Sequence, residues 1–182
     1  MPPPIRVELL PHDPSWAGRA RDESVLLHAA LGDTVLAVHH VGSTAIPGIH
    51  AKPILDLMPV VRTLPALDAR RGALEALGYA WWGELGLPGR RYCSKDDPHT
   101  GRRRVQLHAY AEGAQDIARH LAFRDFLRRH PDVAAEYDRE KLRCQCLHPL
   151  DSHAYGDCKS AWIREVEARA LVAVATVPLS ME

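Results

Sequence analysis

The chain has 182 residues, of which 46% are hydrophobic, which is enough for one domain with a substantial core. Lysine and arginine number 23 together, and so do aspartate and glutamate, so the formal net charge is zero. A neutral chain has no overall electrostatic attraction to nucleic acid or to an anionic membrane surface. No apolar run is long enough to span a bilayer. These properties argue against nucleic acid and membranes as partners, and they leave the oligomeric state open.

The cysteines are Cys93, Cys144, Cys146 and Cys158. So few cysteines in a chain without a recognisable signal peptide favour a reducing compartment, and we expect a cytoplasmic protein. The run CQCLH brings Cys144, Cys146 and His148 close together, but it lacks the C-x₂-C spacing of structural zinc sites. We therefore expect buried thiols, with a zinc site as the less favoured alternative.

The first 112 residues alternate between predicted strands and helices. Asp13 and Pro14 start a helix that Gly32 ends, and a second helix is expected at 65–77. The later strands follow one another like hairpins, which favours a mixed sheet over a parallel one. Strands are predicted at residues 5–9, 34–38, 54–61, 79–82, 90–94 and 105–110.

After residue 112 the pattern changes to helix. Helices are predicted at 116–129, from Pro131 to about residue 142, and from 151 to about 172. No linker or repeat separates this part from the strands. The sequence predicts a single α+β domain over residues 1–182, with a mixed-sheet core at 1–112 and a helical portion at 113–175.

Asp56 is the one carboxylate in the apolar strand at 54–61. Strand alternation places Asp56 on the same face as Ile54 and Met58. A charge in this position loses hydration that only a cation or hydrogen-bond donors can replace, so Asp56 must have a partner. Upstream, Gly42, Ser43 and Thr44 form a turn that carries two small hydroxyl groups.

The motifs GSTAIPG and AKPILDL resemble those of the GrpB family, which is placed in the nucleotidyltransferase superfamily with the DNA polymerase β-like fold. VELLPHDPSW, LPGRRY, LHAY, RHLAFRDFLRRHPDVAAEYDREK and AYGDCK resemble further blocks of that family. In this superfamily a Gly-Ser turn at a helix start holds nucleotide phosphates, and carboxylates on the next strand hold divalent metal. The resemblance thus implies phosphate binding by Gly42, Ser43, Thr44 and Lys52, and a Mg²⁺ ion on Asp56.

The chain departs from the superfamily pattern at Met58, where a second metal-binding carboxylate is expected. A thioether does not suit Mg²⁺, which puts two-metal catalysis in doubt. Glu112 is a candidate replacement ligand, although a solvated turn is its default role. His108 faces the same way as Gln106 and Tyr110 and is a candidate catalytic residue, with a hydrogen-bonded structural histidine as the alternative.

Several cations are candidates for additional phosphate contacts. Arg124 and Lys159 fall in helical blocks that resemble the family, and ion pairs between helices are the alternative role for them. Arg91 belongs to a basic cluster that either meets a phosphate-bearing ligand or forms a solvated loop. The cluster consists of Arg90, Arg91, Lys95, Arg102, Arg103 and Arg104.

Three functions remain open from the sequence. The first is a nucleotidyltransferase that uses a nucleoside triphosphate and Mg²⁺. The second is a catalytically degenerate module that binds a nucleotide or another phosphorylated metabolite. The third is a protein-interaction role for the helical portion, which no particular residue supports.

Overall fold

The computed structural model describes residues 3–176 and contains one mixed five-stranded sheet. The strand order is β1-β2-β5-β4-β3, in which β2 and β5 are parallel and the other neighbours are antiparallel. This confirms the α+β class and the mixed sheet. The strands are β1 (Val35–Val41), β2 (Leu55–Val61), β3 (Tyr79–Trp81), β4 (Arg90–Asp96) and β5 (Arg103–Ala111).

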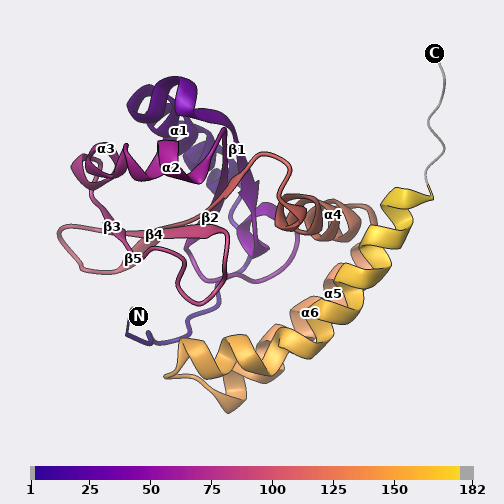
Figure 1. The fold of residues 1–182 in the computed structure, drawn as a ribbon. Coiled ribbons are helices and arrows are strands. Elements are labelled where there is room, and N and C mark those ends of the chain that lie inside the picture. Colours follow the sequence, from indigo (N-terminus) through magenta and orange to yellow (C-terminus); the bar gives the residue numbers. More distant parts are fainter. Residues whose placement is uncertain (1–2, 177–182) are drawn as a thin grey trace.

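Three helices cover one face of the sheet (Figure 1). They are α1 (Ser15–Leu31), α2 (Leu64–Asp68) and α3 (Arg71–Ala76). The predicted helix at 65–77 is therefore two short helices. The alternate residues Leu55, Leu57 and Val61 of β2 face this layer, on the side opposite to Asp56 and Met58, and they are almost completely buried.

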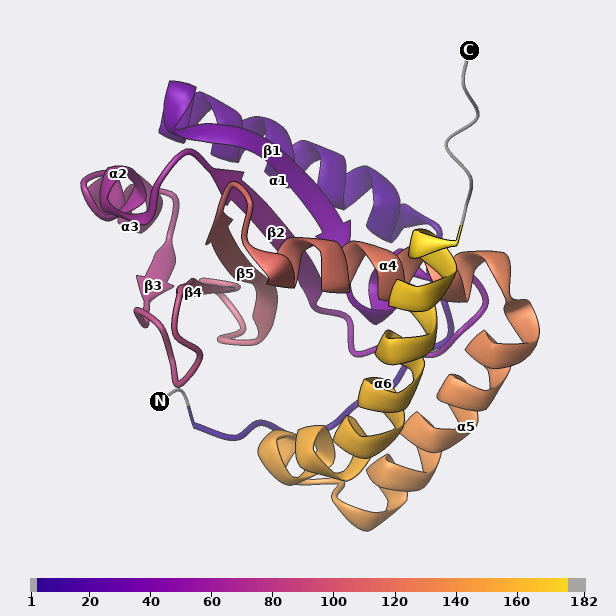
Figure 2. The same ribbon diagram turned by 45° about the vertical axis from the view of Figure 1, so that its right-hand side comes forward.

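The other face of the sheet meets the C-terminal helices (Figures 1 and 2). These are α4 (Gln115–Arg129), α5 (Pro131–Leu147) and α6 (Ser152–Ala175). Met58 and Tyr110 pack under Ile117 and Leu121 of α4. Because α4 covers only part of this face, the stretch of β2 and β5 that carries Asp56 and His108 remains open toward α6. None of the described helices is long and apolar enough to cross a membrane.

The N-terminal segment, residues 5–10, ties the sheet to the helices. Leu10 pairs with Ala51 in an isolated bridge, while Val7 donates its N–H to the Pro149 carbonyl at 2.9 Å. Ile5 donates its N–H to Ser152 Oγ at 3.0 Å. The strand predicted at 5–9 is therefore an extended strap outside the sheet, because its backbone groups bond to the α5–α6 connection.

Candidate functional site

A cleft of about 260 Å³ opens between the sheet and α6. Its floor is formed by Asp56 of β2 and by Gln106 and His108 of β5. Two segments that are distant in sequence complete the walls: the connection between β1 and β2, and the first two turns of α6. These walls contribute Gly42, Ser43, Thr44, Lys52, Tyr155 and Lys159, together with His120 of α4.

Gly42 brings the backbone into direct contact with the Asp56 carboxylate. Its φ of 70° and ψ of −172° lie in a region that only glycine readily adopts. A Cβ atom on Gly42 would lie 2.3 Å from Asp56 Oδ2, a distance that no real contact tolerates. Glycine is thus required here both by the conformation of the turn and by the carboxylate beside it.

Asp56 has a hydrogen-bond partner, as its position in an apolar strand led us to expect, and this partner is His108. His108 Nε2 lies 3.3 Å from Asp56 Oδ1, and it must donate because an ionised carboxylate only accepts. Burial raises the pKa of Asp56, but the hydrogen bond and charge of His108, with the charges of Lys52 and Lys159, outweigh it and hold the pKa below its ordinary value. Asp56 is therefore ionised at neutral pH and is able to hold a cation.

Lys52 and Lys159 are cations without a carboxylate partner. Within residues 3–176 neither ammonium forms an ion pair; Lys159 Nζ lies 3.4 Å from the Tyr137 hydroxyl, and both lysines lie over the Tyr155 ring. Burial, followed by the charge of Lys159, lowers the pKa of Lys52 to about 8. Partly buried cations that lack an anion favour an anionic ligand.

The hydroxyl groups of the turn have different roles. Thr44 is buried, and its Oγ1 lies 2.8 Å from His40 Nε2. Burial lowers the pKa of His40 to about 4, so the ring is neutral at physiological pH. Ser43 Oγ makes no hydrogen bond to another described residue and lines the cleft. Ser43 is thus the hydroxyl that is available to a ligand.

The turn is shorter than the superfamily pattern implies. Ser43–Ala45 form a single 3₁₀ turn rather than the start of an α-helix, so the turn lacks the dipole of a full helix. Two arginines of α4 hold it instead. Arg128 Nε donates to the Ala45 carbonyl at 2.8 Å, and Arg124 Nη1 donates to the His40 carbonyl at 3.0 Å. Arg124 therefore supports β1 and the turn from behind and does not line the cleft.

Two other predicted site residues lie elsewhere. Glu112 is exposed beyond the end of β5, about 20 Å along the strands from the level of Asp56, which pairs with Gln106. Arg91 points to the opposite face of the sheet and bonds to Asp68 at 2.6 Å. The structure brings neither residue to the cleft, so Glu112 does not replace the missing metal ligand.

Met58 is completely buried in the apolar cluster under α4, together with Val41 and Tyr110. The place of a second metal-binding carboxylate is therefore part of the core. Asp56 is the only carboxylate among the described residues that line the cleft. One carboxylate suits Mg²⁺, which keeps several waters and takes phosphate oxygens as further ligands. The donor set fits one such ion and does not fit two.

Sequence reasoning did not identify His120, Tyr155 and Gln106 as a group. His120 comes from α4, and its ring centroid lies 6.0 Å from that of His108. Burial lowers the pKa of His120 to about 4, so its ring is also neutral at physiological pH. The alternation of β5 put Gln106 on the face of His108, but only the packing of α4 and α6 brings His120 and Tyr155 to the cleft.

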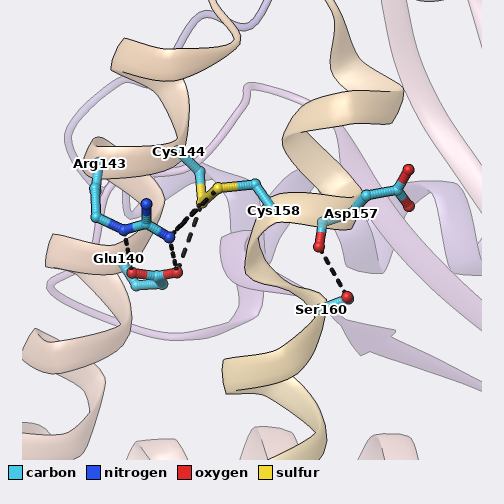
Figure 3. Close-up of a disulfide and its surroundings, with 6 residues drawn as sticks. All are labelled: Glu140, Arg143, Cys144, Asp157, Cys158 and Ser160. Carbon is cyan, nitrogen blue, oxygen red and sulfur yellow. Dashed lines mark hydrogen bonds and ion pairs between the residues drawn. A yellow bond between two sulfur atoms is a disulfide. The ribbon is translucent and has the colours of Figure 1, made fainter.

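The cysteine prediction needs correction. Cys144 of α5 and Cys158 of α6 form a disulfide (Figure 3). Cys146 is a free, exposed cysteine. Cys144, Cys146 and His148 are not arranged as a zinc site, because Cys144 is bonded to Cys158 and residues two apart on a helix point to nearly opposite sides. Arg143 lies beside the bond and pairs with Glu140 at 2.7 Å, as Figure 3 shows. The bond joins α5 to α6 immediately before Lys159.

Replacing Cys144 with serine is expected to lower the free energy of unfolding by about 3 kcal/mol in the oxidised protein, because the bond closes a loop with a sequence separation of 14. Urea unfolding with and without a thiol reductant measures this effect. The reductant should destabilise the wild type and leave Cys144→Ser unchanged, whereas Cys146→Ser should behave like the wild type. An equal response of wild type and Cys144→Ser to the reductant would contradict the assignment.

The fold and the cleft together define an α+β protein whose mixed sheet presents one ionised carboxylate among unpaired cations. Residues 6–169 match the family described as GrpB protein, and the chain belongs to this family. It is similar to the UPF0157 protein YqkA of Bacillus subtilis, with 37% identity over 168 residues, or 92% of this chain. That match spans 48% of YqkA, so the chain covers about half the length of this relative.

Two further similarities concern a solved structure and a longer, differently named protein. The solved structure of conserved protein GrpB from Enterococcus faecalis superposes with a TM-score of 0.86 and 34% identity over 92% of this chain and 99% of that one. The dephospho-CoA kinase of Mycolicibacterium paratuberculosis is 31% identical over 186 residues, which cover 90% of this chain and 46% of the kinase. The predicted family is thus confirmed, and it brings no established activity with it.

Proposed function

We propose that the cleft binds a nucleoside triphosphate together with one Mg²⁺ ion and transfers its nucleotidyl group to an acceptor. The observation that carries the proposal is the pair of lysines, Lys52 and Lys159, that face an ionised Asp56 without carboxylate partners of their own. Polyphosphate is the common ligand that offers several negative charges to such cations and oxygen ligands to a cation on Asp56.

Each residue has a distinct role in this proposal. The Gly42 backbone and Ser43 hydroxyl contact the phosphates, Lys52 and Lys159 balance their charge, and Asp56 holds the Mg²⁺ ion, which would neutralise charge on the phosphates. Because His108 Nε2 donates to Asp56, Nδ1 is the ring nitrogen that would take a proton from an acceptor. In the transfer, an acceptor hydroxyl loses its proton to His108 and bonds to the α-phosphorus, while the bond to the β-phosphate breaks and pyrophosphate leaves.

A second candidate function is nucleotide binding without transfer. The buried Met58 favours it, because the second cation that assists attacking and leaving oxygens in two-metal enzymes has no carboxylate here. Release of pyrophosphate from a bound nucleoside triphosphate separates the two candidates. The name of the mycobacterial relatives adds dephospho-CoA to the nucleotides worth testing as ligands or acceptors.

A thermal-shift screen of nucleoside triphosphates with and without Mg²⁺ tests the proposed ligand. At 100 times its dissociation constant, a ligand stabilises the native state by about 2.7 kcal/mol. We expect a Mg²⁺-dependent stabilisation in the wild type that is absent in Asp56→Asn. Asp68→Asn is the matched control, since Asp68 lies on the opposite face of the sheet and pairs with Arg91. Stabilisation of equal size in Asp56→Asn would remove Asp56 from the site.

A further inference from the structure

A groove of about 250 Å³ adjoins the central cleft and shares Lys52 and Ile54 with it. It runs between the N-terminal strap, the segment before β2 and the turn that joins β4 to β5. Three arginines line it together with the shared lysine: Arg6, Arg102 and Arg103. We call this cavity the arginine groove. It brings together cations from three segments that are distant in sequence.

A β-bulge directs Arg103 into the arginine groove. Lys95 pairs with Val105, whereas Asp96 pairs with Arg103, so Arg104 has no partner in the register. Uninterrupted alternation would put Arg104 on the face of Gln106 and Arg103 on that of Val105, and the extra residue reverses the two sides. Arg103 lines the arginine groove, while Arg104 lines a separate cavity beside α1 and pairs with Asp97 at 3.1 Å. Bulges of this kind recur where a strand re-aims a functional side chain.

The charges in the arginine groove are only partly compensated. Arg103 pairs with Asp96, and its charge contributes to the lowered pKa of Lys52. Arg102 lies 3.6 Å from Glu8, and both side chains are largely exposed, so this pair is weak. Arg6 makes no ion pair within residues 3–176. The balance of four cations against Glu8 and Asp96 leaves a net positive cavity with an apolar floor of Pro53 and Ile54.

The N-terminal strap forms the third side of the arginine groove, and its backbone contacts hold it in place. Val7 is buried, and its backbone bonds to Pro149, while the Val7 carbonyl accepts from Gln145 Nε2 at 3.1 Å. Alternation along the extended strap then turns Arg6 and Glu8 away from the buried side and toward the groove. The position of Arg6 is thus set by backbone contacts to the helical portion.

We propose that the arginine groove binds a second phosphate group, that of a phosphorylated acceptor whose reacting end lies in the central cleft. Arginine presents a planar fork of donors that matches phosphate, and Arg103 lies next to Lys52, which contacts both cavities. Continuity through Lys52 and Ile54 allows one bound molecule to occupy both. The role as an acceptor subsite rests on the proposed nucleotidyl transfer, whereas anion binding by the groove is testable without it.

Calorimetric titration with pyrophosphate, without nucleotide or metal, tests the arginine groove. The wild type should bind two molecules, one in each cavity. Arg103→Gln should weaken one of these sites at least tenfold, and Arg6→Gln should weaken the same site. Lys159→Gln should remove the other site and leave the groove intact. Arg104→Gln is the matched control, because it removes the same charge from the neighbouring position and should leave both sites within twofold.

The outcomes separate the two proposals. If Lys159→Gln lost all pyrophosphate binding and Arg103→Gln lost no binding, the proposal for the arginine groove would be overturned. The proposal for the central cleft would stand. Loss in Arg103→Gln with no effect of Lys159→Gln would support the groove and count against the proposed function. Equal losses in Arg103→Gln and Arg104→Gln would mean general charge attraction and overturn the groove. Absence of pyrophosphate binding by the wild type would overturn it as well.

Discussion

Replacing Gly42 with alanine is expected to lower the free energy of unfolding by about 2–4 kcal/mol and to abolish nucleotide binding. The backbone of Gly42 occupies a glycine-only region, which costs an alanine about 1–3 kcal/mol. The new methyl group would also lie 2.3 Å from Asp56 Oδ2, so either the turn or the carboxylate must move. Movement of either one separates Asp56 from the turn that is proposed to bind phosphate.

Gly48→Ala is the matched control. Gly48 also has a positive φ, 79°, but a Cβ atom there would meet nothing within 4 Å. We expect this variant to lose about 1 kcal/mol of stability and to keep its nucleotide affinity. Denaturant unfolding and nucleotide titration measure both effects. Equal behaviour of the two alanine variants would show that the contact between Gly42 and Asp56 does not matter.

Nucleotide affinity is expected to fall roughly tenfold between pH 7 and pH 9. The pKa of Lys52 is lowered to about 8 by burial, so the ammonium group that faces the phosphates loses its proton across this range. Only the protonated form attracts an anion, which makes the observed affinity follow the protonated fraction. A nucleoside triphosphate gains little negative charge above pH 8, so the change belongs to the protein. Titrations at several pH values measure it.

Lys52→Arg provides the control, since a guanidinium stays charged throughout this range and the affinity should no longer depend on pH above 7. The free energy of unfolding of the ligand-free protein depends on pH in the opposite direction from the affinity. Between pH 8 and pH 10.5 the unfolded chain holds a proton that native Lys52 has lost, so the free energy of unfolding rises with pH. Lys141, with its pKa lowered to about 8, adds to this trend, which makes affinity the clearer readout. A pH-independent affinity in the wild type would remove Lys52 from the phosphate site.

The sequence pattern indicated all five strands of the sheet and the polar residues that form the floor of the cleft, but it also predicted a strand at 5–9 that lies outside the sheet. Period-two alternation grouped Asp56 with Met58 in β2 and His108 with Gln106 in β5. The parallel register, in which Asp56 pairs with Gln106, then brings both groups to the same face of the sheet. The same alternation put Met58 beside Asp56, and the structure adds the reason for its apolar character, which is the packing of α4. The side on which a residue of β2 or β5 lies could thus be predicted from the sequence relative to its neighbours in the same strand.

Residues that are brought to the site by the packing of distant elements could not be predicted from the sequence. Whether Arg124 contacts the ligand or the backbone of β1 depends on the angle at which α4 crosses the sheet, which no local pattern specifies. Glu112 lies at the far end of β5, and only the register between β2 and β5 reveals its distance from Asp56. The disulfide depends on the packing of α5 against α6, and helical periodicity cannot indicate which cysteines meet. The bulge that reverses the sides of Arg103 and Arg104 has no sequence signature either.

Anomalous diffraction from crystals grown with Mn²⁺ and a non-hydrolysable nucleoside triphosphate tests the central claim most directly. The account predicts one Mn²⁺ ion bonded to Asp56 and to phosphate oxygens at roughly 2.1 Å, with the phosphates between Ser43 and the two lysines of the cleft. It predicts no second ion near Met58. A pair of ions in the cleft, or a nucleotide bound away from Asp56, would contradict the account.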